Sequence, residues 1–267
     1  MQDMLGAISG DIIGSRFEAR PIQSKDFELF TAQSRFTDDS VLTIALADSL
    51  LQDVPFSQNL KTFFTRYPQA GYGGTFAVWA ASNQVEPYYS FGNGSAMRVS
   101  PVGWFFDDEQ SVLDQAEASA AVTHNHPEGI KGAQSVALGV FLARKGWARK
   151  DIQDRIETQF GYHLDTSLDQ IRPTYSFDVT CQGSVPQAIV AWLESTDFED
   201  AVRNAVSLGG DSDTQACMAG ALAEAFYGGV PQDVAQESLL RLDDFLCGIV
   251  SSFYARIIPN QTLPWLS

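Results

Sequence analysis

Apolar residues recur every three or four positions along most of this chain, and that period limits the folds it can adopt. Leu5, Ile8 and Ile12 would share one face of a first helix, for example. Such spacing matches the 3.6-residue turn of an α-helix, whereas the alternation typical of half-buried strands is scarce. Further helices are expected within residues 41–50, 76–80, 112–120, 130–141, 185–193, 201–206, 216–226 and 239–254. The sequence therefore predicts an all-α protein.

The chain is long and apolar enough to form one large core. It has 267 residues, of which 45% are hydrophobic, and short groups of turn residues separate the expected helices. A core of this size needs no disulfide or metal to stabilise it. No repeat or low-complexity linker divides the sequence, so we expect residues 1–267 to form a single domain.

Charge and cysteine content exclude several classes of protein. The net charge of −16 disfavours non-specific nucleic-acid binding, although a phosphate-bearing ligand can still bind where local donors meet it. Three widely spaced cysteines indicate no disulfide framework and suit a reducing compartment. Because no signal peptide or spanning apolar run is evident, we expect a cytoplasmic protein without a membrane partner. Nothing in the sequence defines the oligomeric state, and we favour a monomer.

Two acidic segments each precede a strongly apolar stretch: residues 36–40 (FTDDS) and 208–214 (LGGDSDT). Helix capping is one interpretation, because Asp, Ser and Thr satisfy the free N–H groups of a first turn. A cap needs only one side-chain oxygen, however, and adjacent carboxylates repel each other unless a cation lies between them. Clustered carboxylate and hydroxyl oxygens suit Mg²⁺ or Mn²⁺. If the two segments faced each other, they could hold two metal ions.

Three more segments join these two in an order that is similar to a known family. They are residues 10–18 (GDIIGSRFE), 92–98 (GNGSAMR) and 123–126 (THNH). Together the five segments resemble the ADP-ribosylglycohydrolase family, which includes the dinitrogenase reductase-activating glycohydrolase. The resemblance implies a compact orthogonal bundle of many α-helices.

The resemblance also implies a site with two Mg²⁺ ions, or alternatively Mn²⁺. The metal ligands would be Thr37, Asp38, Asp39, Asp211, Asp213 and Thr214. The catalytic residues would be Glu18, Asp38 and Asp213. The residues that contact the diphosphate, the ribose or the nucleotide would be Gly92, Asn93, Gly94, Ser95, Met97 and His124.

Several of these residues also have simpler interpretations. Glu18 could be an exposed acid at the end of a helix, and Gly-Asn-Gly alone suits a tight turn. Arg98 could support its loop through an internal ion pair. A zinc site at His124 and His126 is disfavoured, since the chain has three histidines and no nearby cysteine. The aromatic residues considered for adenine stacking, or alternatively for the core, are Phe76, Trp79, Tyr88, Tyr89 and Phe91.

The activity implied by the resemblance is hydrolysis of the bond between ADP-ribose and a modified protein side chain or a small molecule. Arginine is the favoured side chain and serine the second. Two alternatives stay open: a two-metal phosphoesterase, and a family member that binds ADP-ribose or serves as a structural protein without catalysis.

Overall fold

The computed structural model describes residues 4–257 and contains, within them, helices but no β-strand. A single antiparallel bridge joins Gly92 and Thr180. The helices are α1 (Leu5–Gly14), α2 (Asp38–Gln52), α3 (Phe56–Arg66), α4 (Gly74–Ala81), α5 (Gly94–Met97), α6 (Ser100–Phe105), α7 (Glu109–Ala121), α8 (Pro127–Arg144), α9 (Arg149–Phe160), α10 (Leu168–Ile171), α11 (Cys181–Leu193), α12 (Phe198–Val206), α13 (Ser212–Tyr227), α14 (Gln232–Leu239) and α15 (Asp244–Ile257). The predicted all-α class is confirmed.

Glycines allow α1 and α13 to pack with their backbones in direct contact. Gly6, Gly10 and Gly14 repeat every four residues and so lie on one face of α1. A Cβ atom at Gly10 would lie only 2.0 Å from the carbonyl oxygen of Ala216, and one at Gly14 would lie 2.5 Å from that of Ser212. This contact places the acidic start of α13 beside the C-terminal half of α1.

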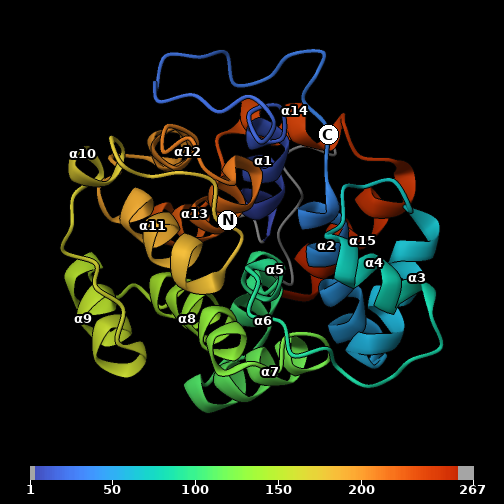
Figure 1. Cartoon of the computed structure of the whole chain (residues 1–267). Helices are drawn as coiled ribbons and strands as arrows, with labels where there is room; N and C mark the ends of the chain where they lie inside the picture. The colour runs from blue at the N-terminus through green and yellow to red at the C-terminus, as the bar shows by residue number, and fades with distance from the viewer. Residues whose placement is uncertain (1–3, 258–267) are drawn as a thin grey trace.

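The other helices surround this central pair (Figure 1). On one side, α2 contacts α1 and α15, and α3 packs between α2 and α4. On the other side, α8, α11 and α12 cover α13, while α7 and α9 pack outside α8. Buried apolar side chains form one cluster that extends from Met4 in the first turn to Phe253 in α15.

Two expectations about helix boundaries were wrong. The stretch 239–254 is not one helix, because α14 ends at Leu239 and α15 begins only at Asp244. Residues 92–98 are not wholly a loop, since Gly94–Met97 form the short helix α5. The periodicity also missed α9, which buries only Ile152 and Ile156 against the core.

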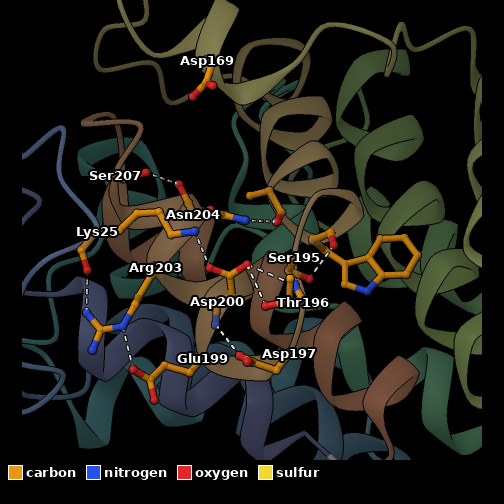
Figure 2. Close-up of polar contacts among 12 residues, drawn as sticks. Lys25, Asp169, Ser195, Thr196, Asp197, Glu199, Asp200, Arg203, Asn204 and Ser207 are labelled. Atoms are coloured by element: carbon orange, nitrogen blue, oxygen red, sulfur yellow. Dashed lines mark hydrogen bonds and ion pairs between the residues drawn. The ribbon is translucent and has the colours of Figure 1, made fainter.

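A long segment, residues 15–37, joins α1 to α2 and crosses over α12. Lys25 forms an ion pair with Asp200, and the Arg203 guanidinium donates to the carbonyl oxygens of Lys25 and Phe27, each at 2.7 Å (Figure 2). The side chain of Gln23 donates to the carbonyl oxygen of Arg172 at 2.7 Å. These contacts hold the segment, which includes Glu18, against the body of the protein.

The cysteines and the helix lengths bear on two further expectations. Cys181, Cys217 and Cys247 are all free thiols. Within residues 4–257, none of the helices combines the length and the apolar character that crossing a bilayer requires.

Candidate active site

The start of α2 is held by Asp11, a fully buried carboxylate of α1. Its oxygens accept hydrogen bonds from the backbone N–H groups of Thr37 at 2.9 Å and Ser40 at 3.0 Å. They also accept from the hydroxyls of the same two residues, that of Thr37 at 2.7 Å. Because four donors converge on the Asp11 oxygens, this residue positions the first turn of α2.

Asp39 connects the two acidic segments. It is only 2% exposed, and its Oδ2 lies 3.3 Å from the Thr37 hydroxyl and 3.3 Å from the Thr214 hydroxyl. Its other oxygen, Oδ1, is buried and has no hydrogen-bond partner. A buried carboxylate oxygen without a partner is costly, and a bound cation would satisfy it. The starts of α2 and α13 therefore meet here, although 175 residues separate Asp39 from Thr214.

The N-cap side chain of α13 does not cap the helix. Asp211 occupies the N-cap position but makes no side-chain cap bond; its Oδ2 instead accepts from the Asn93 amide at 2.7 Å. Two glycines shape the approach to it: Gly209 has φ +72°, and a Cβ atom at Gly210 would lie 2.4 Å from the ring of Tyr175. For Asp211, the capping interpretation fails, and the carboxylate stays directed toward the acidic pocket. Thr37 does cap α2, because it accepts from the Asp39 N–H.

Two groups of carboxylates have the spacing of cation sites. Oxygens of Asp11, Asp39 and Asp213 lie within 4.8 Å of one another, and so do those of Glu18, Asp211 and Asp213. Asp213 belongs to both groups. Oxygen ligands at this density suit a hard divalent cation, so the residues that are present fit Mg²⁺ or Mn²⁺.

Electrostatics support the same conclusion. Burial, together with the neighbouring carboxylates, raises the pKa of Asp39 and Asp213 well above their usual range, and raises the pKa of Asp38 to about 8. Partial burial and Asp211 raise the pKa of Glu18, which Arg35 opposes. Among the ion pairs described for residues 4–257, none includes these carboxylates. A divalent cation would supply the missing positive charge.

The acidic groups open into a cavity of about 320 Å³. Its walls include most of the residues expected for the site: Glu18, Asp38, Asp39, Gly92, Asn93, Gly94, Met97, His124, Asp211, Asp213 and Thr214. Thr37 and Ser95 are not part of these walls. The Ser95 hydroxyl donates to the carbonyl oxygen of Gly129 at 2.7 Å, so it holds α5 on α8.

Residues of α5 and His124 also form part of the cavity wall. A Cβ atom at Gly94 would lie 3.3 Å from the His124 Nε2, so the imidazole packs closely on this backbone. Asn93 donates to the Ser184 hydroxyl of α11 at 3.1 Å as well as to Asp211, so it connects α11 to the start of α13.

Arg98 also borders the cavity, although its side chain is completely buried. Its Nη2 donates to the carbonyl oxygen of Ser119 at 3.0 Å and to the Thr123 hydroxyl at 2.8 Å. The internal ion pair that we considered from the sequence is therefore replaced by hydrogen bonds to neutral groups. Burial lowers the pKa of Arg98 to about 10, so the guanidinium keeps its charge at neutral pH.

Comparison with known proteins agrees with this geometry. The family model described as ADP-ribosylglycohydrolase matches residues 3–261. The chain belongs to the ADP-ribosylglycohydrolase family. It is 28% identical over 305 residues to a Homo sapiens protein named ADP-ribosylhydrolase ARH3, covering 84% of each chain. It is 26% identical over 271 residues to ADP-ribosylarginine hydrolase Tri1 of Pseudomonas putida (strain GB-1), covering 86% of this chain and 71% of the relative.

A solved structure described as an ADP-ribosylglycohydrolase-related protein complex shares the fold. Its TM-score is 0.70 at 24% sequence identity, with 96% of both chains covered. The predicted family and its all-α bundle are thus confirmed. Membership in the ADP-ribosylglycohydrolase family also agrees with acidic groups that can bind a metal.

The residues of this candidate site that the sequence did not reveal include Asp11, Phe177 and Val179. Asp11 lies within the segment 10–18 but received no role there, and Phe177 and Val179 line the cavity from a segment without a motif. Phe177 is 53% exposed, which is unusual for its type, but sequence alone gives no exposure.

The aromatic residues considered for adenine divide into three groups. Phe76 and Tyr88 line the cavity. Trp79 is buried in the core and donates to the carbonyl oxygen of Glu86. Tyr89 and Phe91 lie on the surface and contact the His126 ring, with centroids 4.8 and 5.3 Å away. His126, which received no role from the sequence, caps α8 by accepting from the Glu128 N–H.

Proposed function

We propose that this protein hydrolyses the glycosidic bond between ADP-ribose and a modified protein side chain or a small molecule, with two Mg²⁺ ions, or alternatively Mn²⁺, as cofactors. The observation that carries the proposal is one cavity lined by two chemically different sets of residues. One set is the acidic end, which gathers carboxylates, including a buried Asp39 oxygen without a partner, and the other set presents glycine backbone and an imidazole.

The acidic end would hold the metals. The proposed ligands are Thr37, Asp38, Asp39, Asp211, Asp213 and Thr214. When bound, the metals would lower the pKa of a water molecule in the site and offset negative charge that develops on oxygen atoms during the reaction. Asp11 and Asn93 hold the ligand-bearing helix starts in place through the hydrogen bonds described above.

The glycine-rich part of the lining would hold the diphosphate and the adjoining ribose. Gly92, Gly94 and Met97 form this wall, and His124 stands behind the two glycines. Glycine exposes backbone N–H groups to phosphate oxygens without a side chain in the way. In the proposal, Asn93 and Ser95 act mainly by holding α5, because their side chains already have protein partners.

Glu18 is the proposed general base. It is the exposed carboxylate of the second acidic group, and its raised pKa favours proton transfer at neutral pH. Glu18 would take a proton from the attacking water as the bond between C1″ and the leaving group breaks through an oxocarbenium-like centre. The leaving nitrogen or oxygen keeps the bonding electrons and takes up a proton, so the net reaction adds one water across the bond. Asp38 and Asp213 complete the catalytic set as carboxylates that face the same space.

Arginine is the favoured aglycone and serine the second. A guanidinium is cationic, so Glu18 and the neighbouring carboxylates would attract it, whereas a serine hydroxyl carries no charge.

A panel of arginine-, serine- and small-molecule-linked ADP-ribose conjugates tests the proposal, each with Mg²⁺, with Mn²⁺ and with chelator. We expect metal-dependent release of ADP-ribose, lost in Asp38→Ala and in Asp213→Ala but kept in Asp154→Ala, a carboxylate of α9 that pairs with Lys150. Release of inorganic phosphate instead would establish the phosphoesterase alternative. ADP-ribose binding without any hydrolysis would establish the non-catalytic one.

A further inference from the structure

Three side chains form a hydrogen-bonded row that ends at His124 in the wall of the cavity. The Arg98 Nη2 donates to the Thr123 Oγ1 at 2.8 Å, and the same hydroxyl oxygen lies 2.8 Å from the His124 Nδ1. Arg98 and Thr123 have no exposed surface, and His124 is 5% exposed. Because the row is buried, hydrogen bonds within the protein determine where each proton lies, without competition from water.

The donors and acceptors of this row limit where the imidazole proton can be. A guanidinium only donates, so the Thr123 oxygen must accept from Arg98. The Thr123 hydroxyl still has its own hydrogen, and His124 Nδ1 lies within reach of it. If Nδ1 accepts that hydrogen, a neutral imidazole must carry its single proton on Nε2.

Burial and one titratable neighbour, Tyr88, determine the charge of the row. Burial, assisted by the charge of Arg98, lowers the pKa of His124 well below its usual range, which keeps the ring neutral. Burial raises the pKa of Tyr88, whose ring lies 5.9 Å from the His124 ring, while Arg98 and Thr123 oppose that rise. Tyr88 is therefore a protonated phenol at neutral pH and adds no charge to the row.

The Nε2 atom is on the cavity side of the ring. Cβ atoms at Gly94 and Gly92 would lie 3.3 and 3.5 Å from it. Within the described residues, the His124 side chain makes its hydrogen bond through Nδ1 alone. A proton on Nε2 would thus point at a ligand beside α5, whereas the other tautomer would present a lone pair and repel an anion.

We infer that Arg98 and Thr123 are positioning residues that fix His124 as the neutral Nε2–H tautomer, so that its N–H donates to an anionic oxygen of the bound substrate. The identity of that anion as the ADP-ribose diphosphate rests on the proposed function. The tautomer itself rests only on the row of hydrogen bonds.

The tautomer can be read directly by long-range ¹H–¹⁵N correlation spectroscopy of the full-length ¹⁵N-labelled protein. The chain has three histidines, and His124→Gln identifies the signals of interest by their loss. At pH 7 we expect His124 to show a protonated Nε2 and an unprotonated Nδ1. His126 is an internal reference, because its Nδ1 accepts a backbone N–H at 3.1 Å.

Variants test the role of the row. Thr123→Val should populate the Nδ1–H tautomer and weaken ADP-ribose binding roughly tenfold, the loss expected for one hydrogen bond to a charged group. Thr123→Ser should restore both properties. Thr62→Val, which removes an exposed hydroxyl of α3, should change neither.

Three results would overturn the inference: a wild-type His124 protonated on Nδ1, one protonated on both nitrogens, or an unchanged tautomer in Thr123→Val. The wild-type spectrum decides even if the valine variant does not fold. A wild-type Nε2–H signal in a protein that neither binds ADP-ribose nor releases it would refute the proposed function and leave the tautomer assignment intact.

Discussion

The contact between α1 and α13 makes a sharp prediction for Gly10→Ala. The new Cβ atom would lie 2.0 Å from the Ala216 carbonyl oxygen, and contacts shorter than 3.0 Å are essentially never seen, so the two backbones must separate by about 1 Å. Overpacking of this kind costs about 1–3 kcal/mol. Gly248 in α15 is the matched control, since a Cβ atom there meets nothing within 4 Å. Gly248→Ala should therefore stabilise the protein by about 0.5–1 kcal/mol.

Thermal unfolding of the two variants measures the difference. Together the two effects amount to about 2–4 kcal/mol, which corresponds to melting temperatures roughly 4–8 °C apart for a chain of this size. The separation of α1 from α13 should also reduce the rise in melting temperature that Mg²⁺ produces, because Asp11 and Asp213 move apart. Equal stability of Gly10→Ala and wild type would refute the close backbone contact, and an unchanged Mg²⁺ effect would refute its role in assembling the acidic groups.

Three further predictions concern the carboxylates and the segment that carries Glu18. Burial raises the pKa of Asp38 to about 8 in the folded protein, whereas the unfolded chain releases this proton near pH 4. In chelator, the free energy of unfolding should therefore decrease as the pH rises from about 4 to about 8. Asp38→Asn should make this decrease smaller in melting curves recorded across the same range. Glu18→Gln should lower kcat by roughly 10²–10⁴-fold while the Mg²⁺-induced rise in melting temperature persists; an undiminished kcat would remove Glu18 as the base. Arg203→Gln should accelerate tryptic cleavage within residues 20–35 by about tenfold, since two hydrogen bonds to that segment are lost. The control Arg155→Gln, which breaks a pair with Glu109, should leave the cleavage rate unchanged.

The sequence predicted the parts of the fold in which local signals and packing agree. Segments with a continuous apolar face, such as those of α2 and α8, became helices near the expected positions. Helix α9 was missed because only two of its apolar residues are buried, so its pattern resembles that of a polar loop. The boundary between α14 and α15 was missed because apolar residues continue across the turn that separates them.

The site was predictable where a motif carried it and was not predictable where burial decides the role. The two acidic segments could be found by their composition, but their meeting depends on glycines of α1 that show no polar chemistry. Asp11 looked like a helix residue, and only its four hydrogen bonds show that it holds the start of α2. Ser95 looked available to a ligand, yet its hydroxyl is already engaged by Gly129.

The long sequence separation between Asp39 and Thr214 has a consequence for how the protein is made. While α13 has not yet emerged from the ribosome, a nascent chain contains only the acidic residues that precede it, such as Asp39. In the proposed metal site, ion uptake would then be a late event that follows docking of the last third of the polypeptide on the first. Bound metal would therefore distinguish finished molecules from truncated ones.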